Sequence, residues 1–327
     1  MLLLDTDRQP AESATIDPAF RADVLRGLAA RPRAIPARWL YDERGSKLFE
    51  EITRLPEYYP TRTERRLLSA HAQDIADHAV GVRTVVEFGS GSSGKTPTLL
   101  SAVKPAAYAP IDICGEFLRR SAAKLAASFP QTRVHPVEGD FTRPVPLPAS
   151  IGPGRRLGFF AGSTIGNLPV PAAVDLLRTF VRTLGEDGML LIGIDRVQAP
   201  DLLVPAYDDA QGVTAEFNLN LLRRINRELR GRVPVDGFRH VARWNAAETR
   251  IEMHLEARRD VRFEIEGQGF SMAAGETIHT ENSHKYGPRD ASLLLRAGGW
   301  RPLAEWTDRQ GRFGLYLAAA APSAAAP

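Results

Sequence analysis

Hydrophobic positions in the middle of the chain occur in short continuous runs that alternate with stretches of helical spacing. The runs cover residues 84–88, 107–111, 133–137, 157–160 and 189–194. Residues 95–103, 116–127 and 172–184 lie between them and have the spacing of amphipathic helices. Parallel strands buried on both faces read as continuous apolar runs, and crossover helices join them. The pattern therefore predicts an α/β unit built on a parallel sheet.

The pattern changes after Asp195. A helix is predicted from residue 214 until Gly231 ends it, with one apolar stripe formed by Phe217, Leu221, Ile225 and Leu229. Residues 240–244, 250–257 and 261–266 alternate between apolar and polar, which is typical of half-buried antiparallel strands. Residues 300–306 and 313–318 again resemble strands at a sheet edge. We therefore expect residues 198–286 to form an insertion into the α/β unit.

Composition narrows the class of protein. The chain has 327 residues, 43% of them hydrophobic and 25% charged, as in ordinary globular proteins. Its single cysteine, Cys114, excludes an intramolecular disulfide and fits a reducing compartment. No apolar stretch approaches the ~20 residues of a membrane helix. We expect a cytoplasmic protein without a membrane partner, with flexible ends at residues 1–15 and 319–327.

The net charge of +3 does not indicate a nucleic-acid partner. Lysines and arginines are interspersed with acidic residues, and no stripe of basic and aromatic residues accompanies them. We therefore expect no binding of nucleic acid.

Residues 85–96 carry the strongest chemical signal, the sequence VVEFGSGSSGKT. A strand that enters a Gly/Ser turn before a helix lets backbone N–H groups approach a ligand closely. The turn matches three patterns: that of dinucleotide-binding folds, that of phosphate-binding NTPases, and the E-x-G-x-G pattern of S-adenosylmethionine enzymes. The patterns alone leave these three alternatives open.

Acidic residues near the turn help to distinguish between these three kinds of ligand. In an NTPase, Asp195 at the end of its apolar run would be the Mg²⁺-binding acid. Glu87, however, would repel a triphosphate and would suit the cationic methionyl amine of S-adenosylmethionine. Asp112 follows the next strand, where an acid accepts the ribose hydroxyls of a nucleoside. Asp140 and Phe141 follow the third strand and would lie beside an adenine.

Three unusual strings carry a resemblance to a known family. They are LPEYYPTRTE at residues 55–64, GSTIGNL at residues 162–168 and YDD at residues 207–209. Together they resemble the histidine-specific α-N-methyltransferases of ergothioneine biosynthesis, from about residue 23 through residue 317. The resemblance implies a Rossmann-like core that binds S-adenosylmethionine, residues 62–197 and 287–318. It also implies a smaller α+β histidine-binding domain made of residues 16–61 and 198–286.

The resemblance also implies which residues bind ligands, with S-adenosylmethionine as co-substrate and no metal. Together with the glycine motif, it assigns the methyl donor to Glu87, Gly89, Gly91, Lys95, Asp112, Asp140 and Phe141. It assigns histidine to Tyr41, Tyr58, Gly162, Asn167, Tyr207, Met253, Glu281 and Ser283.

The chemistry of methyl transfer to an amine suggests which part of the substrate each residue binds. Tyr41 and Asn167 are the expected catalytic residues, because their oxygens can hold a neutral α-amino group with its lone pair free. Asn167 and Tyr207 are expected to donate to the substrate carboxylate.

The imidazole ring is expected at the other end of the site. Glu281 would accept a ring N–H, Ser283 and Tyr58 would complete the hydrogen bonds, and Met253 would lie against the ring. The expected substrates are L-histidine and its mono- and dimethyl forms, methylated by a monomeric enzyme.

Three alternatives remain at this point. The protein would be a methyltransferase for another amino acid, such as a tryptophan derivative; an ATP-hydrolysing P-loop protein that uses Thr96 for Mg²⁺; or a sensor that binds the methyl donor without turnover.

Overall fold

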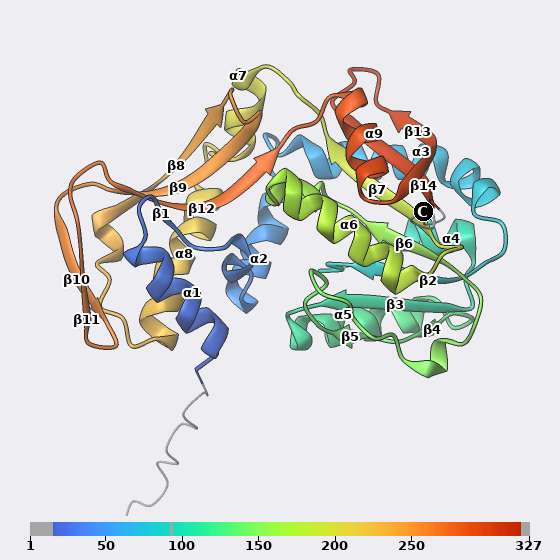
Figure 1. Cartoon of the computed structure of the whole chain (residues 1–327), viewed down its shortest axis with the longest axis horizontal. Coiled ribbons are helices and arrows are strands. Elements are labelled where there is room, and N and C mark those ends of the chain that lie inside the picture. Colours follow the sequence, from blue (N-terminus) through green and yellow to red (C-terminus); the bar gives the residue numbers. More distant parts are fainter. Residues whose placement is uncertain (1–15, 92–93, 322–327) are drawn as a thin grey trace, which may run out of the picture.

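The computed structural model describes residues 16–91 and 94–321 and contains two main sheets, which lie side by side in Figure 1. The larger sheet has eight strands in the order β13-β14-β7-β6-β2-β3-β4, with β5 also paired to β3. Its strands are β2 (Val82–Phe88), β3 (Ala107–Asp112), β4 (Arg133–Val134), β5 (Val137–Glu138), β6 (Arg155–Phe160), β7 (Met189–Asp195), β13 (Trp300–Thr307) and β14 (Phe313–Ala320). Strands β2 to β7 are parallel, whereas β13 and β14 add an antiparallel edge. The predicted Rossmann-like α/β fold is confirmed.

Helices cover both faces of this sheet. Apolar side chains of α3 (Tyr59–His78), α4 (Thr96–Val103) and α5 (Gly115–Ser128) pack on one face, and those of α6 (Val170–Leu184) and α9 (Pro288–Ala297) pack on the other. Every residue of β7 is buried, which explains its continuous apolar sequence. The ligand-bearing ends of β2, β3 and β6 therefore rest on a rigid core.

The smaller sheet has four strands in the order β1-β12-β9-β8. They are β1 (Arg33–Ala34), β12 (Thr277–His284), β9 (Arg250–Ala257) and β8 (Phe238–Asn245). Helices α1 (Pro18–Ala29), α2 (Glu43–Ile52) and α8 (Val213–Glu228) share its core, and the apolar stripe predicted for α8 is buried there. The hairpin of β10 (Val261–Ile265) and β11 (Gln268–Met272) extends from this unit, and the short helix α7 (Pro200–Leu203) leads into it.

Two predictions, one about a strand and one about the C-terminal end, are wrong in detail. The strand expected at residues 133–137 is divided into β4 and β5, because Pro136 has no N–H with which to continue the ladder. The prediction of a flexible end from residue 319 onward is also wrong at its start. Ala319 and Ala320 belong to β14, where they are buried and pair with Met189 and Trp300. The remaining residues of the expected flexible ends, 1–15 and 322–327, lie outside the described residues.

Strand β12 was not predicted. Its sequence, TIHTENSH, carries a single aliphatic side chain, so no period-two signal is visible. The division of the chain into a donor-binding core and a histidine-binding domain stays a proposal, and its boundary at residues 61–62 falls within the first turn of α3. No helix in the described part of the chain is long and apolar enough to cross a membrane.

Candidate active site

A large cleft of about 900 Å³ lies where the carboxyl ends of the parallel strands face the smaller sheet. All seven residues expected to bind the methyl donor line it: Glu87, Gly89, Gly91, Lys95, Asp112, Asp140 and Phe141. This volume is in the range of pockets that hold a nucleotide-sized ligand. The cleft also has the position at which open α/β sheets bind their ligands.

The glycine turn forms one wall of the cleft and needs its glycines. Gly89 and Gly91 adopt φ of 70° and 49°, a region that favours glycine. A Cβ on Gly89 would lie 3.1 Å from the Phe141 ring. The hydroxyl of Ser90 is buried and has no partner among the described residues, so the turn keeps a polar group available for a ligand. This cradle fits a nucleoside-bearing donor such as S-adenosylmethionine.

Asp112 and Asp140 are held at the edge of the same cleft. The two carboxylate oxygens of Asp112 accept the N–H groups of Gly91, at 2.9 Å, and Cys114, at 3.0 Å. Asp140 accepts the Thr142 N–H at 3.0 Å and the guanidinium of Arg38 at 3.3 Å. Backbone donors thus fix the acid that was expected at the ribose.

Glu87 is buried beneath the turn. Its carboxylate accepts the Thr96 hydroxyl at 2.6 Å and also the hydroxyl of Tyr108. Burial raises the pKa of Glu87 to about 7, although both hydrogen bonds lower it. Because Thr96 is buried and donates to Glu87, its hydroxyl does not face the cleft as an Mg²⁺ ligand of an NTPase would.

Glu64 connects the donor cleft with the loop after β6, and sequence reasoning missed it. Its fully buried carboxylate accepts the Gly162 N–H at 2.9 and 3.0 Å and forms an ion pair with Lys95. Gly193 makes room for it, since a Cβ there would lie 2.0 Å from the Glu64 carboxylate. One buried acid therefore positions both Lys95 and the Gly162 backbone.

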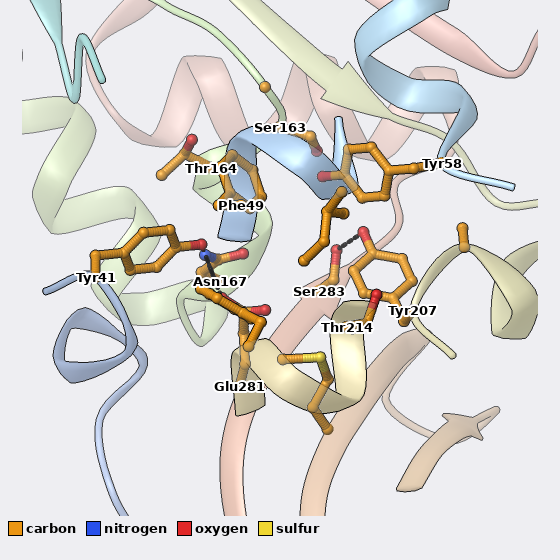
Figure 2. A pocket seen from close by; sticks show the side chains of 15 residues that line it. Tyr41, Phe49, Tyr58, Ser163, Thr164, Asn167, Tyr207, Thr214, Glu281 and Ser283 are labelled. Atoms are coloured by element: carbon orange, nitrogen blue, oxygen red, sulfur yellow. Dashed lines mark hydrogen bonds between the residues drawn. The ribbon is translucent and has the colours of Figure 1, made fainter. Parts of the chain in front are cut away.

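A smaller cavity adjoins the cleft and is shown in Figure 2. All eight residues expected to bind histidine line it: Tyr41, Tyr58, Gly162, Asn167, Tyr207, Met253, Glu281 and Ser283. Five of these, Tyr41, Tyr58, Gly162, Asn167 and Glu281, also line the large cleft. The two spaces therefore meet, as the reacting groups of a donor and an acceptor must.

Glu281 is the centre of the first polar group in this cavity. Its Oε1 accepts the Asn167 side-chain N–H at 3.1 Å and the Tyr41 hydroxyl at 3.3 Å. Burial raises the pKa of Glu281 to about 7, while the Tyr41 hydrogen bond and the charge of Lys285 lower it. Burial also raises the pKa of Tyr41 well above its usual value, so this hydroxyl keeps its proton.

Tyr207 and Ser283 form the second polar group. Their hydroxyl oxygens are 2.7 Å apart (Figure 2). Behind them, Lys285 donates to Tyr207 at 2.8 Å, to Ser283 at 2.9 Å and to Asp195 at 2.6 Å. Asp195 also accepts the Tyr59 hydroxyl at 2.8 Å. The Lys285–Asp195 pair is completely buried, and sequence reasoning assigned no such role to either residue.

Aromatic and apolar side chains complete the cavity. The Tyr58 ring lies edge-on to Tyr207, with centroids 6.0 Å apart, and Phe49 and Phe217 pack beside Tyr41. Met253 of β9 is paired with Glu281 of β12, so its side chain lies beside that carboxylate in the sheet. In the sequence, Phe49 and Phe217 are visible only as apolar positions of helices, without a signal for a ligand.

No group of three or more His, Cys, Asp or Glu side chains within residues 16–91 and 94–321 is arranged to hold a metal ion.

Comparisons with known proteins agree with this geometry. A family model described as "Histidine-specific methyltransferase, SAM-dependent" matches residues 20–320. A Histidine N-alpha-methyltransferase of Mycolicibacterium smegmatis is 44% identical over 306 residues, covering 92% of this chain and 94% of that protein. Its counterpart by name in Mycobacterium tuberculosis is 42% identical, covering 92% and 95%. The Ergothioneine biosynthesis protein 1 of Neurospora crassa is 30% identical over 88% of this chain and 33% of its own length.

Proposed function

Because this chain belongs to the family of S-adenosylmethionine-dependent, histidine-specific methyltransferases, we propose that it trimethylates the α-amino group of L-histidine. The product is histidine betaine (hercynine), the first intermediate of ergothioneine biosynthesis. The observation that carries the proposal is a polar cavity with one buried carboxylate that opens into the donor cleft. Relatives with 42–44% identity that carry the name Histidine N-alpha-methyltransferase support it.

The reaction is an in-line displacement at carbon. The amine lone pair forms the new C–N bond as the bond between methyl carbon and sulfur breaks, and its electrons stay on sulfur as S-adenosylhomocysteine leaves. The nitrogen sheds a proton in the first two transfers, and the third leaves a quaternary ammonium. The protein must therefore align nitrogen, carbon and sulfur and keep water out.

The donor is held by the turn and the acids around it. Asp112, itself fixed by two backbone N–H groups, accepts the ribose hydroxyls. Asp140 and Phe141 bind the adenine, and Glu87 and Lys95 complete the cleft near the methionyl group. Gly89 and Gly91 let the backbone approach the donor.

The acceptor amine is held without a positive charge. Asn167 and Tyr41 direct an N–H and an O–H at Glu281, so the Asn167 carbonyl oxygen and a Tyr41 lone pair are left to accept amine protons. These two acceptors can hold the two N–H groups of the neutral amine, whose lone pair must point at the methyl group. The second N–H of Asn167 is available for the substrate carboxylate, together with Tyr207.

The side chain of histidine is recognised at the opposite end. Glu281 accepts a ring N–H, Ser283 contacts the other ring nitrogen with Tyr58 beside it, and Met253 packs against the ring. Side chains two apart on a strand lie on one face, which brings Glu281 and Ser283 of β12 to the same ligand.

We also propose that the enzyme works as a cytoplasmic monomer without nucleic-acid or membrane partners. The near balance of 42 basic and 39 acidic residues and the single cysteine support this part of the proposal. Sedimentation of the purified protein tests the monomer.

The decisive experiment is mass spectrometry of reactions that contain the purified protein, S-adenosylmethionine and one free amino acid at a time. We expect mass gains of one, two and three methyl groups on histidine alone. Methylation of tryptophan or another amino acid would overturn the proposal that the enzyme is specific for histidine. Donor binding without any product would indicate a sensor, and ATP hydrolysis without methylation would indicate a P-loop enzyme.

A further inference from the structure

Glu64 of α3 is a buried acid to which the proposed reaction gives no part. Its carboxylate is completely inaccessible to solvent, accepts the Gly162 N–H and forms an ion pair with Lys95. The fold keeps a space for it, because any side chain at residue 193 would collide with it. A buried ion pair is often no more stable than an apolar pair of the same size, so stability alone does not explain this one.

The Glu64–Lys95 pair lies where the donor cleft and the acceptor cavity meet. Gly162 lines both of these spaces. Lys95 lines the donor cleft, and a Cβ on Gly162 would lie 3.6 Å from the Lys95 Nζ. Glu64 contacts the same residue through the Gly162 N–H, at 2.9 and 3.0 Å. Both charges are therefore close to the point at which the methyl group passes from donor to acceptor.

The reacting centre is cationic throughout each methyl transfer. The sulfur of S-adenosylmethionine is positive, the transition state shares the charge between sulfur and nitrogen, and nitrogen carries it once the bond to sulfur has broken. An unpaired lysine ammonium at this point would repel all three states. A lysine that is paired with a carboxylate adds no net charge, so the cationic donor can bind beside it.

We propose that Glu64 is a positioning residue that cancels the charge of Lys95 at this junction and so lets the site accept a cationic donor. It thereby sets the preference between S-adenosylmethionine, whose sulfur is positive, and S-adenosylhomocysteine, whose sulfur is neutral. Lys95 can then contact the methionyl group without repelling the sulfonium. This inference rests on the proposed function, because it takes the junction of the two spaces as the place of methyl transfer.

Removing one charge of the pair should change this preference in a direction that depends on which charge is lost. Glu64→Gln keeps an oxygen that can accept the Gly162 N–H but leaves the charge of Lys95. S-adenosylmethionine should then bind more weakly relative to S-adenosylhomocysteine. Lys95→Met leaves the charge of Glu64, so S-adenosylmethionine should bind more tightly relative to S-adenosylhomocysteine.

The size of each shift follows from Coulomb's law. At an effective dielectric constant of about 20, a unit charge about 12 Å away changes the dissociation constant of a charged ligand roughly tenfold. We therefore expect each single variant to change the ratio of the two dissociation constants about tenfold. The double variant Glu64→Gln/Lys95→Met loses both charges, so its ratio should return to within about threefold of wild type.

The test is calorimetric titration of each variant with S-adenosylmethionine and, separately, with S-adenosylhomocysteine, in the absence of histidine. The two ligands share their adenine, ribose and methionyl carboxylate and amine, so general damage to the cleft weakens both and cancels in the ratio. Glu43→Gln is the matched control. It removes the acid of the exposed Glu43–Lys47 pair, which lies outside the residues that line the two spaces, and should leave the ratio unchanged.

Opposite shifts in the two single variants, with a wild-type ratio in the double variant, would support the inference. Shifts of the same sign, or equal weakening of both ligands, would mean that Glu64 only supports the fold and would overturn it. If Glu64→Gln does not fold, Lys95→Met decides, since a ratio that fails to move in favour of S-adenosylmethionine contradicts the charge argument. The proposed function is tested separately, by the methylation of histidine by the wild type, so the two failures are distinguished.

Discussion

Replacing Glu281 by glutamine tests the proposed recognition of the imidazole most directly. The side-chain carbonyl oxygen of the variant can still accept from Asn167 and Tyr41, which now bond to Glu281 at 3.1 and 3.3 Å. The new amide NH₂ group, however, would meet the ring N–H with another donor. The loss of one hydrogen bond to a charged acceptor costs about 1.5–3 kcal/mol. We therefore expect Glu281→Gln to bind histidine about 10- to 150-fold more weakly.

The loss should also depend on pH in a definite direction. Burial raises the pKa of Glu281 to about 7, so at pH 6 its carboxyl is mostly protonated and at pH 8 it is mostly ionised. The advantage of wild type over Glu281→Gln should therefore grow from pH 6 to pH 8. Titration of histidine itself affects both proteins equally and cancels in the ratio of their dissociation constants.

The assay is calorimetric titration with histidine and, separately, with S-adenosylhomocysteine. The donor product should bind within about threefold of wild type, because the acids at the far end of the cleft are unchanged. Glu252→Gln is the matched control: Glu252 lies on the neighbouring strand β9, is bonded to Asn245 and Arg250, and lines neither cavity. Equal loss of both ligands in Glu281→Gln, or a ratio that does not change with pH, would refute the assigned role.

Three further predictions concern the donor cleft and its support. Asp112→Ala should raise the dissociation constant of S-adenosylmethionine by about 10- to 100-fold with little change for histidine, since the Gly91 N–H also loses its acceptor; fluorescence titration of each ligand measures this. Gly193→Ala should destabilise the fold by about 1–3 kcal/mol and lower kcat, because its Cβ would lie 2.0 Å from Glu64. Gly269→Ala, whose Cβ meets no atom within 4 Å, is the control for urea unfolding, and equal stability of the two variants would contradict the packing argument. Glu87→Gln should gain stability relative to wild type as the pH rises from 4.5 to 7, by at most ~3 kcal/mol: the raised pKa of about 7 means that the folded state keeps a proton the unfolded chain has lost. Melting temperatures that differ equally at pH 5 and pH 8 would contradict this linkage.

Several features of this protein were determined by the sequence alone. The near-continuous apolar runs of β2, β3, β6 and β7 predicted the parallel sheet, because strands buried on both faces have few polar positions. The stripe on α8 predicted its buried face in the same way. The glycine turn predicted a ligand at the end of β2, and the strings at residues 55–64 and 162–168 were specific enough to indicate the family. Each of these signals lies within one short stretch of sequence, so it can be recognised without the three-dimensional structure.

Only the tertiary structure determined the polar contacts between residues that are far apart in the sequence. Tyr41 and Glu281 are separated by 240 positions and Asp195 and Lys285 by 90, yet both pairs meet in the acceptor region. Nothing in the sequence around Glu64, Asp195 or Lys285 shows which side chain each of them meets, because a charged side chain has no periodicity that reports its partner. Strand β12, which brings Glu281 and Ser283 to one face and ends just before Lys285, is itself too polar to be recognised as a strand. Burial raises the pKa of Glu281 and brings these side chains together, and burial is a property of segments that meet only after the chain has folded.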